Sequence, residues 1–189
     1  MVRAVAAGAH ILWRRLDRPG HDACRLWSEG ALWRIEGMAV WADASGPAQI
    51  AYEVSASEDW VTRSARLMGR AGKRAVSLSI HRDDLGNWRV NGESVPEVTG
   101  LRDIDLGFTP ATNTLPIRRM RAARQDGADL AGAWLDPDDW QLKPLPQHYE
   151  RRGDNGWHYR SPSHDFTADL TIDGDGLVTD YPPLWIKEV

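Results

Sequence analysis

Cysteine is almost absent from this sequence, since Cys24 is the only one among its 189 residues. A single thiol cannot form an internal disulfide, and such sparse use of cysteine is typical of proteins in a reducing compartment. No apolar run approaches the roughly 20 residues that a transmembrane helix requires. The apolar stretch near the start is short and ends at His10, so we do not expect a signal peptide. The sequence therefore predicts a cytoplasmic protein without a transmembrane segment.

An excess of positive charge is also lacking. The chain has 23 Lys and Arg against 27 Asp and Glu, which gives a net charge of −4. Proteins that bind nucleic acid usually present a basic face, so we expect no nucleic-acid partner. The basic run from Arg63 to Arg74 is interpreted as a solvated surface. The length and the hydrophobic content of 42% fit a single domain over residues 1–189.

Sequence patterns typical of enzymes are missing as well. There is no Gly-x-Ser-x-Gly turn for a nucleophile and no glycine-rich phosphate loop. His158 and His164, together with Asp165, come closest to a metal or acid–base cluster. Because no cysteine or second carboxylate stands at tetrahedral spacing to them, we expect no metal and no other cofactor. The chain is predicted not to be an enzyme.

Alternating apolar and polar residues are the main structural signal. Period-two stretches at 32–41, 49–55, 75–81 and 166–173 are bounded by Gly, Asp, Asn or Ser, which is typical of strands and tight turns. A short helix is expected within Ala128–Trp134 or Pro137–Leu142. The pattern predicts an all-β, single-domain, highly curved roll or incompletely closed barrel with little helix. Unpaired strand edges in such a fold allow a homodimer.

Two pairs of short segments resemble each other and keep their order along the chain. Ser57–Trp60 is similar to Pro137–Trp140, and Leu78–Asp83 is similar to Leu170–Asp175. These matches suggest two similar β-halves that wrap around one another. A curved sheet that does not quite close would leave an interior, which is how β-folds hold an apolar ligand.

The segment from Asp103 to Arg119 has the composition of a built site. Two carboxylates spaced by two leave the same face of a strand, and the two prolines fix the backbone between short polar residues. The arginine pair at its end supplies fork-shaped donors for those carboxylates. We interpret it as a rigid irregular loop, structured by Asp103, Asp105, Pro110, Pro116 and Arg119. Adjacent strand residues face opposite ways, so one arginine of the pair could point inward and bind a polar ligand group.

The same segment closely resembles the signature segment of the glycolipid-binding family, first catalogued as a domain of unknown function. The resemblance extends over nearly the whole chain and includes Asp59–Arg63, Gly86–Trp88, Phe166–Ala168, Gly176–Val178 and Tyr181–Pro182. Leu101 and Ala111 depart from the family pattern, which usually has Cys and a larger apolar residue there. The resemblance implies a spiral β-roll similar in outline to lipoprotein carriers, without their export signal.

We therefore predict non-catalytic binding, or carriage, of an amphipathic lipid, in particular a glycolipid, in or beside the roll. The ten tryptophans favour this because Trp suits sugar faces and wet interfaces, although Trp is also common in β-sheet cores. The residues expected to contact the ligand are Trp60, Arg63, Trp88, Thr112, Asn113, Arg118 and Tyr181. Two alternatives stay open. One is an enzyme that acts on a lipid or sugar conjugate through Asp103 and Asp105 or through His158 and His164. The other is a protein-interaction module with an exposed Trp patch.

Overall fold

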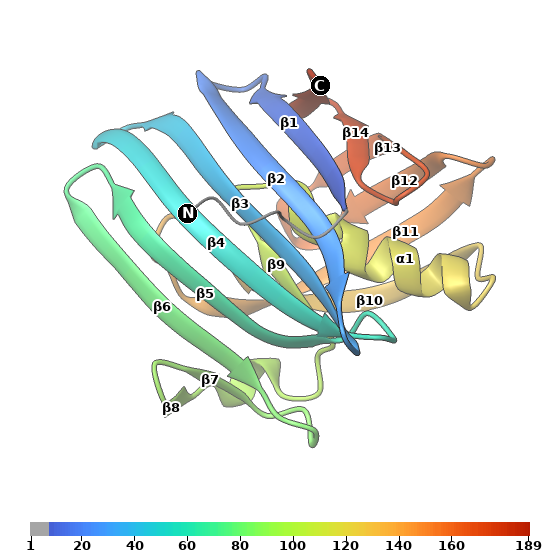
Figure 1. Ribbon diagram of the computed structural model, residues 1–189, viewed down its shortest axis with the longest axis horizontal. Helices are drawn as coiled ribbons and strands as arrows, with labels where there is room; N and C mark the ends of the chain where they lie inside the picture. The colour runs from blue at the N-terminus through green and yellow to red at the C-terminus, as the bar shows by residue number, and fades with distance from the viewer. Residues whose placement is uncertain (1–7) are drawn as a thin grey trace.

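One curved sheet of fifteen strands dominates the computed structural model, which describes residues 8–189 (Figure 1). The first eight strands are β1 (Ala9–Arg15), β2 (Gly20–Glu29), β3 (Leu32–Asp43), β4 (Gly46–Ser57), β5 (Thr62–Ala71), β6 (Arg74–Arg82), β7 (Trp88–Val90) and β8 (Glu93–Ser94). The other seven are β9 (Asp103–Leu106), β10 (Gly127–Leu135), β11 (Leu142–Arg152), β12 (Gly156–Ser161), β13 (Phe166–Ile172), β14 (Val178–Tyr181) and β15 (Trp185–Lys187). The helical segments are α1 (Thr114–Ala122) and the 3₁₀ turns η1 (Pro96–Val98), η2 (Ala111–Asn113) and η3 (Pro162–His164).

The strand order begins in the middle of the sheet. β1 pairs with both β2 and β15, and the chain runs outward from there to β8 at one edge before it crosses to β9 at the other. All neighbouring strands are antiparallel except β9 and β10, which are parallel. The sheet curls until the two halves meet: the Thr62 amide donates to the Arg102 carbonyl at 3.0 Å. Since β5 and β9 do not pair as strands, the roll stays open, and the predicted curved, unclosed all-β fold is confirmed.

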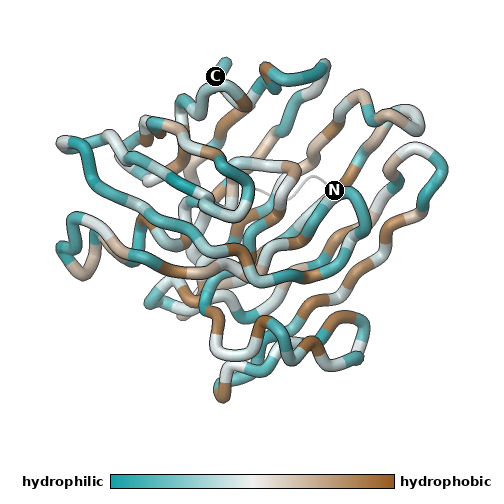
Figure 2. The backbone as a smooth tube through the Cα atoms, turned by 180° about the vertical axis from the view of Figure 1, so that it is seen from behind, coloured by the Kyte–Doolittle hydropathy of each residue, from teal (hydrophilic) through white to brown (hydrophobic). Residues whose placement is uncertain are grey.

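The alternation in the sequence explains which face of the sheet is buried. In β4 the five residues that point into the curve are all buried, namely Ala48, Ile50, Tyr52, Val54 and Ala56. Figure 2 shows the same alternation of hydrophobic and hydrophilic positions along the strands. The core also takes in the whole first turn of α1, where Leu115 and Ile117 are 0% exposed and point to different sides of the helix. The interior of the roll is therefore filled by side chains from the sheet and the helix.

The position of the helix differs from the expectation. Residues 128–134 belong to strand β10, and the Pro137–Leu142 region forms a turn before β11 rather than a helix. The helix α1 lies instead within the segment that we expected to be an irregular loop. Pro116 stands in its first turn, where the missing N–H breaks no hydrogen bond, and Arg119 and Arg121 stand in its last turn, near the negative end of the helix dipole.

The first of the two sequence similarities marks equivalent turns. Trp60 and Trp140 both have a left-handed backbone, with φ of 61° and 63°. The second similarity covers β6 and β13 and the turns that follow them. Asp83 and Asp173 each accept a hydrogen bond from the amide four residues later, at 2.8 and 2.9 Å, although the sequence match aligns Asp83 with Asp175. The segments between the turns differ in the two halves. Two strands, β5 and β6, lie between the turns at Trp60 and Asp83, whereas three strands, β11, β12 and β13, lie between those at Trp140 and Asp173. The likeness is thus one of turns.

Seven of the ten tryptophans are buried, so these residues do not form an exposed Trp patch of the kind that an interaction module needs. Trp27, Trp33 and Trp134 are half-buried. Within residues 8–189 no helix has the length and the apolar character needed to cross a membrane.

Candidate ligand-binding groove

A groove of about 920 Å³ crosses the outer face of β1 to β6, the face turned away from the core. This face is toward the viewer in Figure 1. Three consecutive rows of residues, each running across the six strands, account for nearly all of its lining. Side chains of the middle row point into the core, so the floor consists largely of backbone. That middle row is Ile11, Cys24, Gly37, Tyr52, Leu67 and Leu78.

One side of the groove, which we call the apolar wall, is formed by residues that are direct partners from strand to strand. They are Leu12, Ala23, Met38, Ala51, Met68 and Ser77. Adjacent strands are about 4.8 Å apart, so the row is about 24 Å long. Met38 is 47% exposed and Met68 is 70% exposed, which is unusual for large apolar side chains set in one line. Val189 borders the β1 end of the groove.

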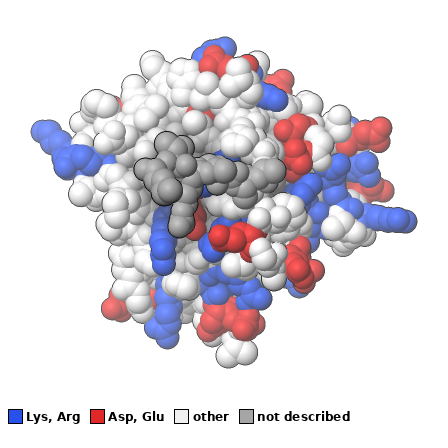
Figure 3. All heavy atoms as spheres, viewed as in Figure 1, with Lys and Arg blue, Asp and Glu red and all other residues white. Residues whose placement is uncertain are grey.

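The opposite side, the polar wall, is the next row of direct partners that face outward. It consists of His10, Arg25, Glu36, Glu53, Arg66 and Ser79. Two of its carboxylates form ion pairs: Glu36 with Arg25 at 2.7 Å, and Glu53 with Arg34 at 3.0 Å. Figure 3 shows charges of both signs mixed over this side of the molecule, without a large area of either sign. The groove therefore has one apolar and one charged side.

Gly37 lies in the middle of the floor of the groove and adds no side chain to either face of the sheet. On the core side of the sheet, the Tyr52 ring lies against Gly37, and a Cβ added there would come within 2.3 Å of the Tyr52 hydroxyl oxygen. That hydroxyl donates to Asp22 Oδ2 at 2.7 Å, and Thr109 donates to the same oxygen. Asp22 is 0% exposed, and burial raises the pKa of its carboxyl to about 6, against the lowering effect of these two hydrogen bonds. A polar network thus supports the floor from beneath.

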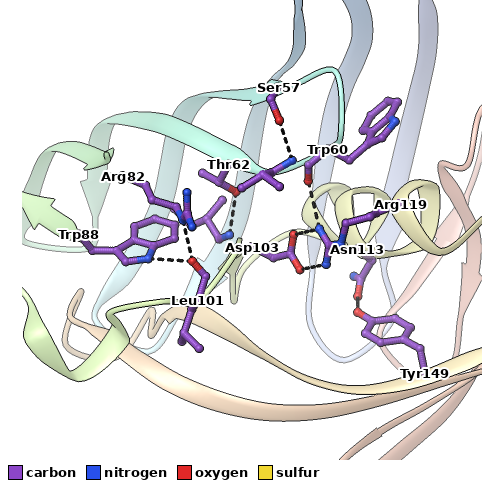
Figure 4. A network of polar contacts seen from close by, with 12 residues as sticks. Ser57, Trp60, Thr62, Arg82, Trp88, Leu101, Asp103, Asn113, Arg119 and Tyr149 are labelled. Atoms are coloured by element: carbon purple, nitrogen blue, oxygen red, sulfur yellow. Dashed lines mark hydrogen bonds and ion pairs between the residues drawn. The ribbon is translucent and has the colours of Figure 1, made fainter. Parts of the chain in front are cut away.

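The two central carboxylates, Asp103 and Asp105, have different partners, and Figure 4 shows those of Asp103. Arg119 Nη1 donates to Asp103 Oδ1 at 2.6 Å and to the Trp60 carbonyl at 3.2 Å, so this arginine joins α1, β9 and the turn after β4. Asp105 accepts from Gln147 at 2.6 Å, and burial raises the pKa of its carboxyl to about 6. Because both arginines lie on a helix, the expectation that they face opposite sides of a strand is wrong.

Thr112 and Asn113 lie in the tightly packed part of the core. Thr112 Oγ1 accepts the Leu106 amide at 3.1 Å, and Asn113 Oδ1 accepts the Tyr149 hydroxyl at 2.7 Å (Figure 4). The cavity that they border has a volume of about 10 Å³. Such a space holds about one water molecule. A lipid head group would not fit beside these residues, whose hydrogen bonds serve the fold.

The other residues expected to contact a ligand are spread over the structure. Trp88 is 0% exposed and donates its ring N–H to the Leu101 carbonyl at 3.1 Å. Arg63 forms an exposed ion pair with Asp84. Tyr181 packs in an aromatic cluster inside the roll, with its ring centre 6.0 Å from that of Tyr159.

The structure brings two of the expected contact residues together. The guanidinium carbon of Arg118 lies 4.5 Å from the Trp60 ring centre and 5.1 Å from that of Trp33. The two Trp rings stack on each other at 4.3 Å. Trp33 is on the core-facing side of β3, so this cluster lies on the other face of the sheet from the groove. None of the seven expected contact residues lines the groove, and a role for Arg118 and Trp60 in binding stays a prediction.

The residues proposed for catalysis lie away from the groove. Asp103 and Asp105 border the cavity of about 10 Å³. His158 pairs with Asp169 at 2.7 Å on the surface, and His164 packs its ring against Trp134 with 5.0 Å between ring centres. Over residues 8–189 no group of three or more His, Cys, Asp or Glu side chains could hold a metal ion.

The fold places the protein in the class of open, β-barrel-like rolls. Residues 10–187 match the family described as "Putative glycolipid-binding", and the chain belongs to this family. The crystal structure of a DUF1089 family protein from Pseudomonas aeruginosa is similar, with a TM-score of 0.78 and 28% identity over 100% of both chains.

A second similar structure is a β-barrel-like protein of the domain of unknown function DUF1849 from Brucella abortus. It has a TM-score of 0.54 and 9% identity, and the likeness covers 97% of this chain and 95% of the other. At that identity the likeness concerns the fold alone. A comparison with curated proteins gave no match.

Proposed function

We propose that this protein binds an amphipathic lipid, specifically a glycolipid, without chemical change, in the groove across β1 to β6. The observation that carries the proposal is the pairing of an apolar wall with a charged wall along one groove of about 920 Å³. Ligand sites of this size are usually concave and mainly apolar, with a few polar groups that fix orientation. The family's description supports the same class of ligand.

The apolar wall suits one hydrocarbon chain. Its length of about 24 Å exceeds the roughly 15 Å that one leaflet contributes to a bilayer core of about 30 Å. Each buried methylene contributes about 0.8 kcal/mol, so ten of them supply about 8 kcal/mol before the ordering costs of binding. A free energy of that size corresponds to micromolar affinity. Met38 and Met68 are well suited to this contact because methionine side chains adapt to irregular apolar shapes.

The polar wall suits a sugar head group. Guanidinium groups only donate hydrogen bonds and carboxylates only accept them, whereas each sugar hydroxyl can do both. The Arg25–Glu36 pair offers the two roles side by side along the groove. Neutral hydroxyls can bind to such a pair without leaving an unmatched charge, which favours a glycolipid over a plain hydrocarbon.

Titration calorimetry with dodecyl maltoside, a single-chain neutral glycolipid, tests the proposal. We expect Met38→Asp and Met68→Asp each to weaken binding at least about tenfold, because a carboxylate in the apolar wall must be desolvated by the chain. Leu85→Asp is the matched control, since Leu85 is 85% exposed and lies outside the groove. Equal affinity of all four proteins would refute the site. Recovery of the glycolipid unchanged after incubation is the expected result for a binder, and its cleavage would refute the non-catalytic role.

A further inference from the structure

The two ends of the groove differ in the polar groups that they leave available. At the β1 end, Arg25 is held by Glu36 and stacks on Trp27, whose ring centre is 4.0 Å from the guanidinium carbon. The lining there continues with the apolar residues Leu12 and Val189 and with the imidazole of His10, the partner of Arg25 across β1 and β2. The arginine at this end is therefore matched by a carboxylate.

At the other end, Arg66 on β5 is the arginine without such a partner. Among residues 8–189 its guanidinium makes no ion pair within 4.0 Å and no hydrogen bond. Glu53 stands directly opposite on β4, but its carboxylate bonds to Arg34 at 3.0 Å. Arg66 thus presents an exposed, permanently charged fork of donors to the groove.

Two serines of β6 lie on the same outer face as Arg66, one directly opposite it and one diagonal to it. Ser79 is the direct partner of Arg66 across β5 and β6, and Ser77 is the partner of Met68 at the end of the apolar wall. Asn91 fixes this part of β6 through the backbone, with 2.8 Å from the Ser79 amide and 3.2 Å to the Ser77 carbonyl. Within the described chain neither serine hydroxyl has a hydrogen-bond partner, so both can donate to a ligand.

We propose that the β5–β6 end of the groove binds a phosphate or sulfate ester, so that the ligand is an anionic rather than a neutral glycolipid. The inference rests on the proposed lipid-binding function. It also defines the orientation of the ligand along the groove. The tetrahedral oxyanion contacts Arg66, Ser77 and Ser79, and the hydrocarbon chain runs along the apolar wall toward Val189. A guanidinium binds such an oxyanion through two parallel N–H donors, and hydroxyls complete the set.

A matched pair of twelve-carbon probes tests the inference, namely dodecyl phosphate and dodecyl maltoside. We expect the wild-type protein to bind dodecyl phosphate about tenfold more tightly than dodecyl maltoside. Arg66→Gln should abolish that preference, because it should lower the affinity for dodecyl phosphate about tenfold more than the affinity for dodecyl maltoside. Arg70→Gln is the matched control, because Arg70 lies on the same face of β5 but outside the groove lining, and it should keep the preference.

The outcomes separate the two proposals. Equal affinity of the wild-type protein for the two probes, or a preference that survives Arg66→Gln, would overturn the inference and leave lipid binding intact. Failure of both probes to bind would overturn the proposed function itself. Inorganic phosphate is included as a competitor. If it displaced dodecyl phosphate at equal concentration, the site would bind free phosphate as tightly as the lipid ester, and this would also overturn the inference.

Discussion

The buried carboxylate beneath the groove makes the stability of this protein depend on pH in a direction opposite to that of most aspartates. Asp22 is 0% exposed, and Tyr52 and Thr109 both donate to one of its oxygens. Among the described residues its other oxygen, Oδ1, has no hydrogen-bond partner. The nearby titratable groups are Cys24 and Tyr52, and burial raises the pKa of both. Ionisation of Asp22 therefore places an uncompensated negative charge in the core.

The magnitude follows from the pKa of Asp22, which burial raises to about 6 from an ordinary value of 3.8. Between these values the folded protein keeps a proton that the unfolded chain has released, so stability falls as the pH rises through this window. Each pH unit is worth about 1.4 kcal/mol, so the full loss is about 3 kcal/mol. The loss is complete above about pH 6 and absent below about pH 4.

Asp22→Asn removes this ionisation while keeping the shape of the side chain. In urea unfolding followed by circular dichroism, the stability of the variant relative to the wild type should rise by about 3 kcal/mol between about pH 4 and pH 6.5. Asp105, whose pKa is raised by burial as well, titrates in both proteins and cancels in the difference. A difference that stays constant with pH would refute the reasoning.

The control for this experiment is an aspartate with the opposite shift. Hydrogen bonds from the Ser45 amide and hydroxyl lower the pKa of Asp43, so its ionised form stabilises the fold. Its contribution is present above the unfolded value of 3.8 and is lost as the pH falls through the lowered folded value. Asp43→Asn should therefore show the opposite sign to Asp22→Asn below about pH 3.8, and no change relative to the wild type between about pH 4 and pH 6.5.

Two further substitutions test the packing around the central segment and beneath the groove. Arg119→Met leaves the buried carboxylate of Asp103 unpaired and should cost about 3–5 kcal/mol of stability in urea unfolding. Arg63→Met breaks an exposed pair with Asp84 and should cost less than about 1 kcal/mol. Similar losses for the two variants would contradict the burial of Asp103. Gly37→Ala places a methyl group against Tyr52 and should cost about 1–3 kcal/mol in thermal unfolding. Gly174→Ala, which meets nothing within 4 Å, should be neutral, and an equal effect of the two would argue against the contact.

The sequence predicted those parts of the fold that depend on local patterns. Alternation between apolar and polar positions identified β3, β4, β6 and β13. The similarity of Ser57–Trp60 to Pro137–Trp140 corresponds to two turns that each hold a tryptophan with a left-handed backbone. The helix α1 was missed because it is short, and Pro116 in its first turn resembles the punctuation of a loop. The opposite error at 128–134 arose because Ala and Leu favour helices, whereas pairing with β9 and β11 makes this segment a strand.

The groove could not be predicted because it depends on register. Leu12, Ala23, Met38, Ala51 and Met68 are far apart in sequence, and they become neighbours only through the lengths of four hairpins. A register shift of one residue in any strand would turn its side chain to the other face of the sheet. Three of the expected contacts, Thr112, Asn113 and Arg118, came instead from the conspicuous Asp103–Arg119 segment, where Asn113 has its partner within the fold. The other four came from shorter motifs elsewhere in the chain.

The central position of the first strand has a consequence for how the chain folds as it is made. Trp13 in β1 pairs with Lys187 in β15, so one edge of β1 stays without a partner until the end of the domain has left the ribosome. An exposed strand edge is a template for pairing with other chains, and contacts so distant in sequence form slowly. A circular permutant that joins the two ends and opens the chain at Gly100, between β8 and β9, would have its strands in the same order in sequence and in space. We expect that permutant to fold faster than the natural chain and to aggregate less during synthesis.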